Sequence, residues 1–224
     1  MTAVTHAEPG AVDCVLLDVD GTLIDSTYLH ALAWQRAFAR HQLDVPWWET
    51  HFAIGMGGDL LVPHLGGPAV EERIGEQLRA QWAEEYRAVL PEVRAIPGAA
   101  DLVGHLVAAG HRVALASSGA DEFTDAALSL LGLDRDDFAA VTSSDDAERS
   151  KPAPDLLRAA MDSAGGSTAV LVGDSVWDAQ AANQMSIPFV GVRTGGIAES
   201  DLLGAGASRV VDSVVTLVDE SWRP

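Results

Sequence analysis

The residues best suited to chemistry begin with two aspartates that follow an apolar run. Val15, Leu16 and Leu17 lead into Asp18, and Asp20 follows two positions later, ahead of a Gly-Thr pair. An apolar run without helical periodicity is typical of a buried parallel strand, and the carboxyl ends of such strands open onto the ligand crevice of an α/β sheet. Two carboxylates at that edge predict a site. The alternative is a solvent-exposed turn, where Asp and Gly are also common.

Polar residues also follow later apolar segments of the chain. They are Ser117, Ser118 and Gly119, then Lys151, then Asp174 and Asp178. In a parallel sheet all strand ends of this kind lie on one edge, so we expect these side chains to converge. Any single serine or aspartate among them could be an ordinary helix cap. Lys151 is the only lysine among 14 Lys plus Arg residues, and its position supports the site.

Four carboxylates at one edge predict a cation. Asp18, Asp20, Asp174 and Asp178 would share a small volume, and they cannot all stay ionised unless a positive charge offsets them. Hard oxygen ligands suit Mg²⁺, which also binds waters and a substrate phosphate. Hydroxyl and backbone N–H groups in residues 117–119 can hold phosphate oxygens. One carboxylate can then attack phosphorus, and a second can protonate the leaving group and later activate water.

Composition bounds the class of protein. A length of 224 residues predicts one domain, or one domain with an insertion. The formal net charge of −19 argues against nucleic acid and against anionic membranes as partners. No apolar run is long enough to span a bilayer, and the N-terminus lacks signal-peptide features. The single cysteine, Cys14, cannot form an internal disulfide, so we expect a cytoplasmic protein in which Cys14 is a core residue.

The elements that position these residues fall into two groups. Residues 27–90 show helical spacing only, which predicts helices over 27–41, 60–64 and 68–90, with a connection at Pro46–Trp48. From Pro97 onward strands and helices alternate. The predicted strands are 111–116, 139–142, 169–172, 189–192 and 210–211, and the predicted helices are 99–110, 121–131, 155–165, 177–185 and 214–218. This layout predicts an α/β fold, a parallel sheet with helices on both faces and a helical insert after its first strand.

Four short motifs then resemble a known family. D-V-D-G-T at 18–22, A-S at 116–117, K-P at 151–152 and G-D-S-V-W-D at 173–178 are similar, in order, to the four motifs of the haloacid dehalogenase (HAD) superfamily. The first motif is fairly specific, the others are weak singly, and the four together are strong. They extend across the whole chain.

The resemblance implies an architecture and a cofactor. The expected core is Rossmann-like and comprises residues 1–25 plus 96–224, and residues 26–95 form an inserted α-helical cap. A hinge is expected where the chain enters and leaves this insert, near Asp25–Ser26 and Arg94–Pro97. The cofactor implied is Mg²⁺.

The resemblance also implies a role for each site residue. Asp18 is the nucleophile that forms an aspartyl-phosphate, and Asp20 is the general acid/base whose backbone carbonyl binds Mg²⁺. Asp178 orients either the waters of the metal or Lys151. The candidates are catalytic Asp18, Asp20 and Lys151; phosphate-binding Ser117, Ser118, Gly119 and Lys151; and metal-binding Asp18, Asp20, Asp174 and Asp178.

Two features of the insert resemble the branch that contains β-phosphoglucomutase and phosphoglycolate phosphatase. In β-phosphoglucomutase a histidine at the position of His30 assists catalysis; the alternative is a histidine on the helix surface or at a hinge. The other feature is a candidate substrate-reading loop, whose alternative is a glycine-rich connection between helices. Its residues are Ile54, Gly55, Met56, Gly57 and Gly58. The aromatic residues Trp34, Trp82, Tyr86 and Phe123 are expected to pack only.

The predicted function is that of a Mg²⁺-dependent phosphatase acting on a small phosphorylated metabolite through an aspartyl-phosphate. Dehalogenases of the family lack an acid at the position of Asp20, so its presence favours phosphoryl chemistry. The main alternative is a β-phosphoglucomutase-like phosphosugar mutase. A non-catalytic binding protein on the same fold is another, since fold does not fix function. The sequence indicates neither the substrate nor the oligomeric state.

Overall fold

A six-stranded parallel sheet forms the centre of the molecule. The computed structural model describes residues 12–224, and β1 (Cys14–Leu17) lies in the interior of the strand order β5-β4-β1-β6-β7-β8. The other strands are β4 (Arg112–Ala116), β5 (Ala140–Thr142), β6 (Ala169–Gly173), β7 (Phe189–Val192) and β8 (Arg209–Val211). β1 is fully buried and pairs with β4 and β6 in register. This confirms the predicted Rossmann-like parallel core.

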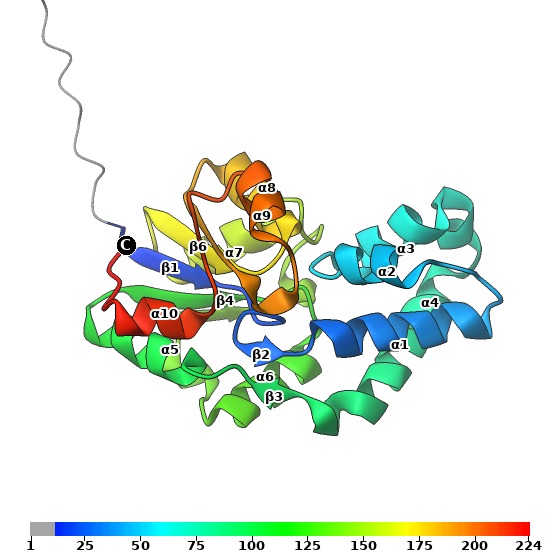
Figure 1. The fold of residues 1–224 in the computed structure, drawn as a ribbon, viewed down its shortest axis with the longest axis horizontal. Coiled ribbons are helices and arrows are strands. Elements are labelled where there is room, and N and C mark those ends of the chain that lie inside the picture. The colour runs from blue at the N-terminus through cyan, green and yellow to red at the C-terminus, as the bar shows by residue number, and fades with distance from the viewer. Residues whose placement is uncertain (1–11) are drawn as a thin grey trace, which may run out of the picture.

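Helices cover both faces of the sheet, because successive strand residues point to opposite sides. Val15 and Leu17 belong to an apolar cluster that includes residues of α5 (Ala99–Ala108), α6 (Asp121–Leu131) and α10 (Val214–Asp219). Cys14 and Leu16 belong to a second cluster with α7 (Asp155–Ser163), α8 (Val176–Met185) and α9 (Glu199–Gly204). Figure 1 shows α5 and α10 on one side of the strands and α8 and α9 on the other. Burial raises the pKa of the Cys14 thiol to about 11, in keeping with a core residue.

The helical insert lies beside the sheet (Figure 1). It consists of α1 (Thr27–Arg40), α2 (Trp47–Ala53), α3 (Gly58–Gly66) and α4 (Pro68–Val89), and its own apolar cluster includes Trp34, Phe38 and Leu78. The chain enters the insert through β2 (Ile24–Asp25) and leaves it through β3 (Arg94–Ala95), which pair antiparallel. None of the helices in residues 12–224 has the length and apolar character needed to cross a membrane.

The predicted connection at Pro46–Trp48 is wrong, because α2 begins at Trp47. The side chains of Trp47 and Trp48 are 58% and 69% exposed, and only Thr50 and Ala53 of this helix are buried. A helix whose apolar residues face solvent lacks the buried stripe on which the periodicity argument depends. The six-residue α9 and the two-residue strands β2 and β3 were also absent from the sequence prediction, because such short elements carry too few positions to show a period.

A carboxylate before β1 is expected to make stability depend on pH. Asp13 accepts hydrogen bonds from the backbone N–H groups of Thr168 and Ser167, at 2.9 and 3.0 Å, and these lower its pKa to about 2. The pKa of an unfolded aspartate is about 3.9, so the stabilisation is fully present above that pH and is lost as the pH falls through about 2. Asp13→Asn should therefore unfold at lower denaturant concentration at pH 7, and its stability should fall less steeply between pH 4 and 2. The exposed Asp44→Asn is the control, and equal pH profiles for Asp13→Asn and wild type would contradict this account.

Candidate active site

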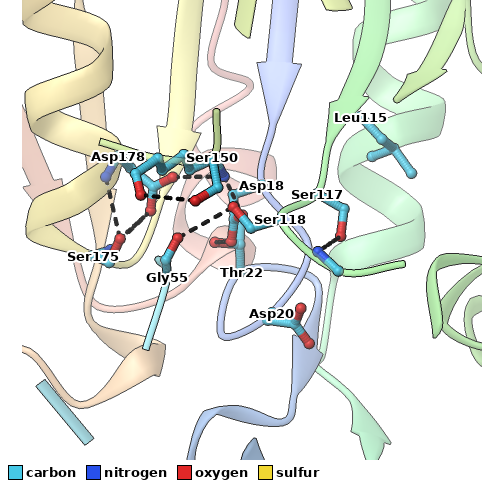
Figure 2. A network of polar contacts seen from close by, with 12 residues as sticks. Asp18, Asp20, Thr22, Gly55, Leu115, Ser117, Ser118, Ser150, Ser175 and Asp178 are labelled. Carbon is cyan, nitrogen blue, oxygen red and sulfur yellow. Dashed lines mark hydrogen bonds and ion pairs between the residues drawn. The ribbon is translucent and has the colours of Figure 1, made fainter. Parts of the chain in front are cut away.

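Residues from four strand ends meet at the carboxyl edge of the sheet. Asp18 follows β1, Ser117 follows β4, Asp174 follows β6, and Lys151 lies in the segment between β5 and α7. One oxygen from each of Asp18, Asp174 and Asp178 lies within 4.8 Å of the others, and all three residues are buried. Figure 2 shows two members of this group, Asp18 and Asp178, near each other at the sheet edge.

Lys151 and Thr22 fix the Asp18 carboxylate. The Lys151 Nζ donates to Asp18 Oδ1 at 2.5 Å, and Thr22 Oγ1 donates to Asp18 Oδ2 at 3.1 Å. Both Asp18 oxygens are thus held by side chains. Lys151 is fully buried. A buried ammonium costs much free energy unless it is paired, so its place beside Asp18 and Asp178 accounts for its burial.

Asp178 holds Lys151 from the other side. Its Oδ1 lies 2.8 Å from the Lys151 Nζ, and its Oδ2 accepts hydrogen bonds from the backbone N–H and the hydroxyl of Ser175. Ser175 is also the N-cap of α8, so a capping box sets the direction of the Asp178 carboxylate. With both oxygens engaged, Asp178 is placed to orient Lys151, which is one of the two roles that the family resemblance implies.

The buried charges at this edge leave an excess of negative charge. Burial raises the pKa of Asp18 to about 7 even though Lys151 opposes that shift, and burial, with the neighbouring Asp18 and Asp178 charges, holds the pKa of Asp174 well above its ordinary value. Burial would lower the pKa of Lys151, but the Asp178 and Asp18 carboxylates raise it overall. Three carboxylates beside one ammonium fit a divalent cation with oxygen ligands.

Two glycines let the backbone approach the Asp174 carboxylate closely. A Cβ at Gly21 (φ +75°) or at Gly195 would collide with Asp174 Oδ2. Among residues 12–224, no group donates a hydrogen bond to the Asp174 carboxylate. A buried carboxylate that accepts no hydrogen bond from the described residues has its oxygens available to a cation.

Gly21→Ala should affect both stability and activity. The variant forces a non-glycine residue into the left-handed region, at a cost of about 1–2 kcal/mol, and adds a methyl group that displaces Asp174. Gly132→Ala is the matched control, because Gly132 has φ +69° but nothing within 4 Å of the added Cβ. We expect Gly132→Ala to lose stability only and Gly21→Ala to lose turnover as well. Equal turnover in the two purified variants would rule out the role assigned to Gly21.

Asp20 points away from the acidic group toward the insert (Figure 2). Its Oδ1 accepts a hydrogen bond from Ser26 Oγ at 2.5 Å and lies 2.8 Å from His30 Nε2. Burial raises the pKa of Asp20, but the neighbouring His30 and the Ser26 hydrogen bond outweigh burial and lower it overall. His30 is buried and stacks on Tyr86 at 3.8 Å between ring centroids. The interpretation of His30 as a helix-surface histidine is therefore wrong.

The loop after β4 supplies small polar groups. Ser117 is buried, and its Oγ accepts the backbone N–H of Gly119 at 3.1 Å. Ser118 Oγ donates to the backbone carbonyl of Gly55 in the insert at 3.2 Å, a contact drawn in Figure 2. Ser118 and Gly119 line the cavity described next. Two of the predicted phosphate-binding residues, Ser118 and Gly119, thus share a cavity with Asp18 and Asp20, whereas Ser117 is not among its lining residues.

A cavity of about 290 Å³ lies between the insert and the sheet edge. Its inner end includes Asp18 and Asp20, and all five predicted loop residues, 54–58, line it. The remaining lining residues include groups for which the sequence analysis assigned no role. Those groups are Trp34, Asp59, Arg79, Trp82, Glu148 and Ser150.

The glycines of the 54–58 loop let it approach the sheet edge closely. A Cβ on Gly55 would lie 2.6 Å from Ser175 Oγ, and one on Gly57 would lie 2.5 Å from the Ser150 Cβ. The backbone N–H of Gly57 donates to Ser150 Oγ at 3.0 Å, and Ser150 Oγ donates to Asp59 Oδ1 at 2.5 Å. The loop is therefore more than a connection between helices, because it is bonded to the residue that precedes Lys151.

Comparisons with known proteins agree with this geometry. A family model described as haloacid dehalogenase-like hydrolase matches residues 12–186. The chain belongs to this hydrolase family. It is 31% identical over 217 residues to a phosphoglycolate phosphatase of Rhodospirillum rubrum, covering 92% of this chain and 89% of that one. The crystal structure of a hydrolase from Pseudomonas syringae matches with a TM-score of 0.88 at 30% identity, over 92% of this chain and 96% of the other.

A further relative is much longer than this chain. The protein SUPPRESSOR OF QUENCHING 1 of Arabidopsis thaliana, described as chloroplastic, is 32% identical over 216 residues. The match covers 92% of this chain but 20% of that protein. It supports the family membership of the matched segment.

Proposed function

We propose that this hydrolase is a Mg²⁺-dependent phosphatase that cleaves a small phosphomonoester through a phosphoryl group carried on Asp18. The main support for the proposal is that the carboxylates of Asp18 and Asp20 have different hydrogen-bond partners. Asp18 is held by Lys151 and Thr22, whereas Asp20, two residues on, is turned to Ser26 and His30. A nucleophile and a separate proton donor are the two groups that hydrolysis in two steps requires.

In the first step an Asp18 oxygen forms a bond to phosphorus while the bond between phosphorus and the ester oxygen breaks. A proton passes to the departing oxygen from the carboxyl group of Asp20, whose Oδ1 lies 2.8 Å from His30 Nε2. In the second step Asp20 removes a proton from water, and this water attacks the phosphorus of the aspartyl-phosphate. Free phosphate leaves and the Asp18 carboxylate is restored.

Mg²⁺ would be held by Asp18 and Asp174, together with the backbone carbonyl of Asp20 that the family resemblance implies. When bound, it supplies positive charge beside the phosphoryl oxygens and lets the buried carboxylates stay ionised. Lys151, which Asp178 holds, and the groups of Ser117–Gly119 would bind the remaining phosphoryl oxygens.

We further propose that residues 26–95 act as a cap over a core made of residues 1–25 plus 96–224. The first eleven residues of that core unit lie outside the described residues. The hydrogen bonds from Ser118 to Gly55 and from Gly57 to Ser150 join the two units at the cavity mouth. The β2–β3 pair, at Ile24–Asp25 and Arg94–Ala95, is the proposed hinge. The cap excludes water other than the attacking molecule.

The test is phosphate release from a panel of phosphorylated metabolites and an aryl phosphate. We expect release with Mg²⁺, loss with a chelator, and recovery when Mg²⁺ is restored. A phosphosugar mutase would convert a hexose 1-phosphate while releasing little phosphate. If the folded protein released phosphate from none of the esters, it would be a binding protein, and the proposal would be wrong.

A further inference from the structure

Part of the cavity lining is aromatic. The indole rings of Trp34 on α1 and Trp82 on α4 stack with centroids 5.3 Å apart and an interplanar angle of 16°, and both residues line the cavity. Indole rings in a cavity lining favour a ligand with apolar C–H surface, because they add apolar contact area there. The proposed phosphoryl-binding residues in the same lining, Asp18, Asp20, Ser118 and Gly119, offer polar groups instead.

Among the described residues that line the cavity, no Lys or Arg side chain is free of an ion pair. Arg79 is the one Lys or Arg side chain among the described residues that line it. Its Nη1 and Nη2 bind Glu71 at 2.8 and 3.0 Å, and Nη1 also donates to the Gly58 carbonyl at 3.2 Å. A bidentate pair of this kind uses the planar guanidinium fully. Gly58 packs against Arg79 as well, since an added Cβ would lie 2.9 Å from Arg79 Cγ.

The other charged groups on the outer lining are carboxylates, Asp59 and Glu148. Carboxylates accept hydrogen bonds from hydroxyl groups and repel other carboxylates or phosphates. A leaving group with a second negative charge would be repelled by the Asp59 and Glu148 carboxylates. It would gain little from Arg79, whose charge Glu71 already neutralises. A polyhydroxylated leaving group would find acceptors on one side and indole rings on the other.

We infer that the substrate is a monophosphate of an uncharged sugar or polyol, and that Glu71 enforces this choice by neutralising Arg79. This inference deepens the proposed phosphatase function and rests on it. It sets the chain apart from an enzyme selective for esters whose leaving group carries a carboxylate or a second phosphate.

The experiment compares kcat/KM within pairs of esters that differ in charge. The pairs are 2-hydroxyethyl phosphate against 2-phosphoglycolate, and a hexose monophosphate against the corresponding bisphosphate, all with Mg²⁺. We expect each neutral member to be favoured by at least about tenfold, because like charges face each other in the complex with the charged member. Preference for the charged members, or for a cationic amine ester such as phosphoethanolamine, would overturn the inference.

A variant that removes the charge of Glu71 tests whether the Glu71–Arg79 pair controls substrate choice or only stabilises the fold. Glu71→Gln frees the Arg79 guanidinium, so it should raise the ratio of kcat/KM for 2-phosphoglycolate to that for 2-hydroxyethyl phosphate by about tenfold. Glu76→Gln, on the same helix and exposed, is the matched control and should not change the ratio. An unchanged ratio in Glu71→Gln would contradict the role given to Glu71.

The aryl phosphate assay distinguishes failure of the substrate inference from failure of the phosphatase proposal. Mg²⁺-dependent release from the aryl phosphate, combined with preference for charged esters, would overturn this inference and leave the phosphatase proposal standing. Absence of release from every ester would overturn both. Trp82→Leu should lower kcat/KM for the hexose monophosphate more than for 2-hydroxyethyl phosphate, because the hexose ring has more C–H surface to lie against the indole.

Discussion

Asp18→Asn is expected to reduce phosphate release by at least about 10⁴-fold, because it removes the attacking carboxylate while keeping nearly the same shape. Asp18 is buried, and its oxygens are bonded to Lys151 and Thr22, so the asparagine should occupy the same place. The loss should appear in kcat for every ester, including those with good leaving groups. Steady-state rates with saturating Mg²⁺ measure it.

The fold of Asp18→Asn should survive. Burial raises the pKa of Asp18 to about 7, which means that the charged carboxylate is disfavoured in this site, and a neutral amide avoids that penalty. Lys151 loses one of its two carboxylate partners but keeps Asp178, so we expect a folded variant whose melting temperature at pH 7 lies close to that of wild type. The exposed Asp101→Asn serves as the control for the substitution itself. Full activity in a folded Asp18→Asn variant would eliminate Asp18 as the nucleophile.

Asp20→Asn is expected to lose about 10²–10⁴-fold in turnover, with a dependence on the leaving group that Asp18→Asn lacks. An alkyl ester must release a poor leaving group, which needs a proton, whereas an aryl ester can leave without one. The loss in kcat/KM should therefore be much larger for the alkyl phosphate. Pre-steady-state assays on both esters give this comparison.

A neighbouring variant provides the control for Asp20. Ser26→Ala removes one hydrogen bond to Asp20 Oδ1 and leaves the His30 contact, so it should lower turnover modestly and equally for both esters. Equal losses for alkyl and aryl esters in Asp20→Asn would show that Asp20 supports the site without transferring a proton.

The innermost residues of the site could be predicted from the sequence because they lie at the ends of strands. Asp18 and Asp174 directly follow buried apolar strands, and parallel strands bring such ends to one edge whatever the details of packing. The unusual position of Lys151, the only lysine, added independent weight. The sheet and most helices were likewise predicted, because each contains enough apolar residues to show a strand-like run or a helical spacing.

The outer half of the cavity was not accessible in the same way. Trp34 and Trp82 were expected to pack only, since their helical spacing is that of core residues, and both do stack on other aromatic rings. Whether one edge of a packed ring also faces a cavity depends on how α1 and α4 sit over the sheet. The sequence did not indicate a role for Arg79, because that role depends on its ion pair with Glu71, two turns away on the same helix.

The glycines of the 54–58 loop illustrate a signal that was present but ambiguous. Glycine-rich stretches occur both in connections and where backbone must approach another chain segment closely. The deciding fact is the closeness of Gly55 to Ser175 and of Gly57 to Ser150. No local pattern encodes that closeness, because the partners lie about a hundred residues away.

The central claim, that Asp18 carries the phosphoryl group, is tested most directly by trapping that group. Asp20→Asn, incubated with an aryl phosphate and Mg²⁺ and quenched in acid, should gain the mass of one phosphoryl group, because the step that hydrolyses it is slowed. Peptide mapping should place the group on Asp18, and the Asp18→Asn, Asp20→Asn double variant should gain nothing. A phosphoryl group on another residue, or turnover without any trapped group, would contradict the account.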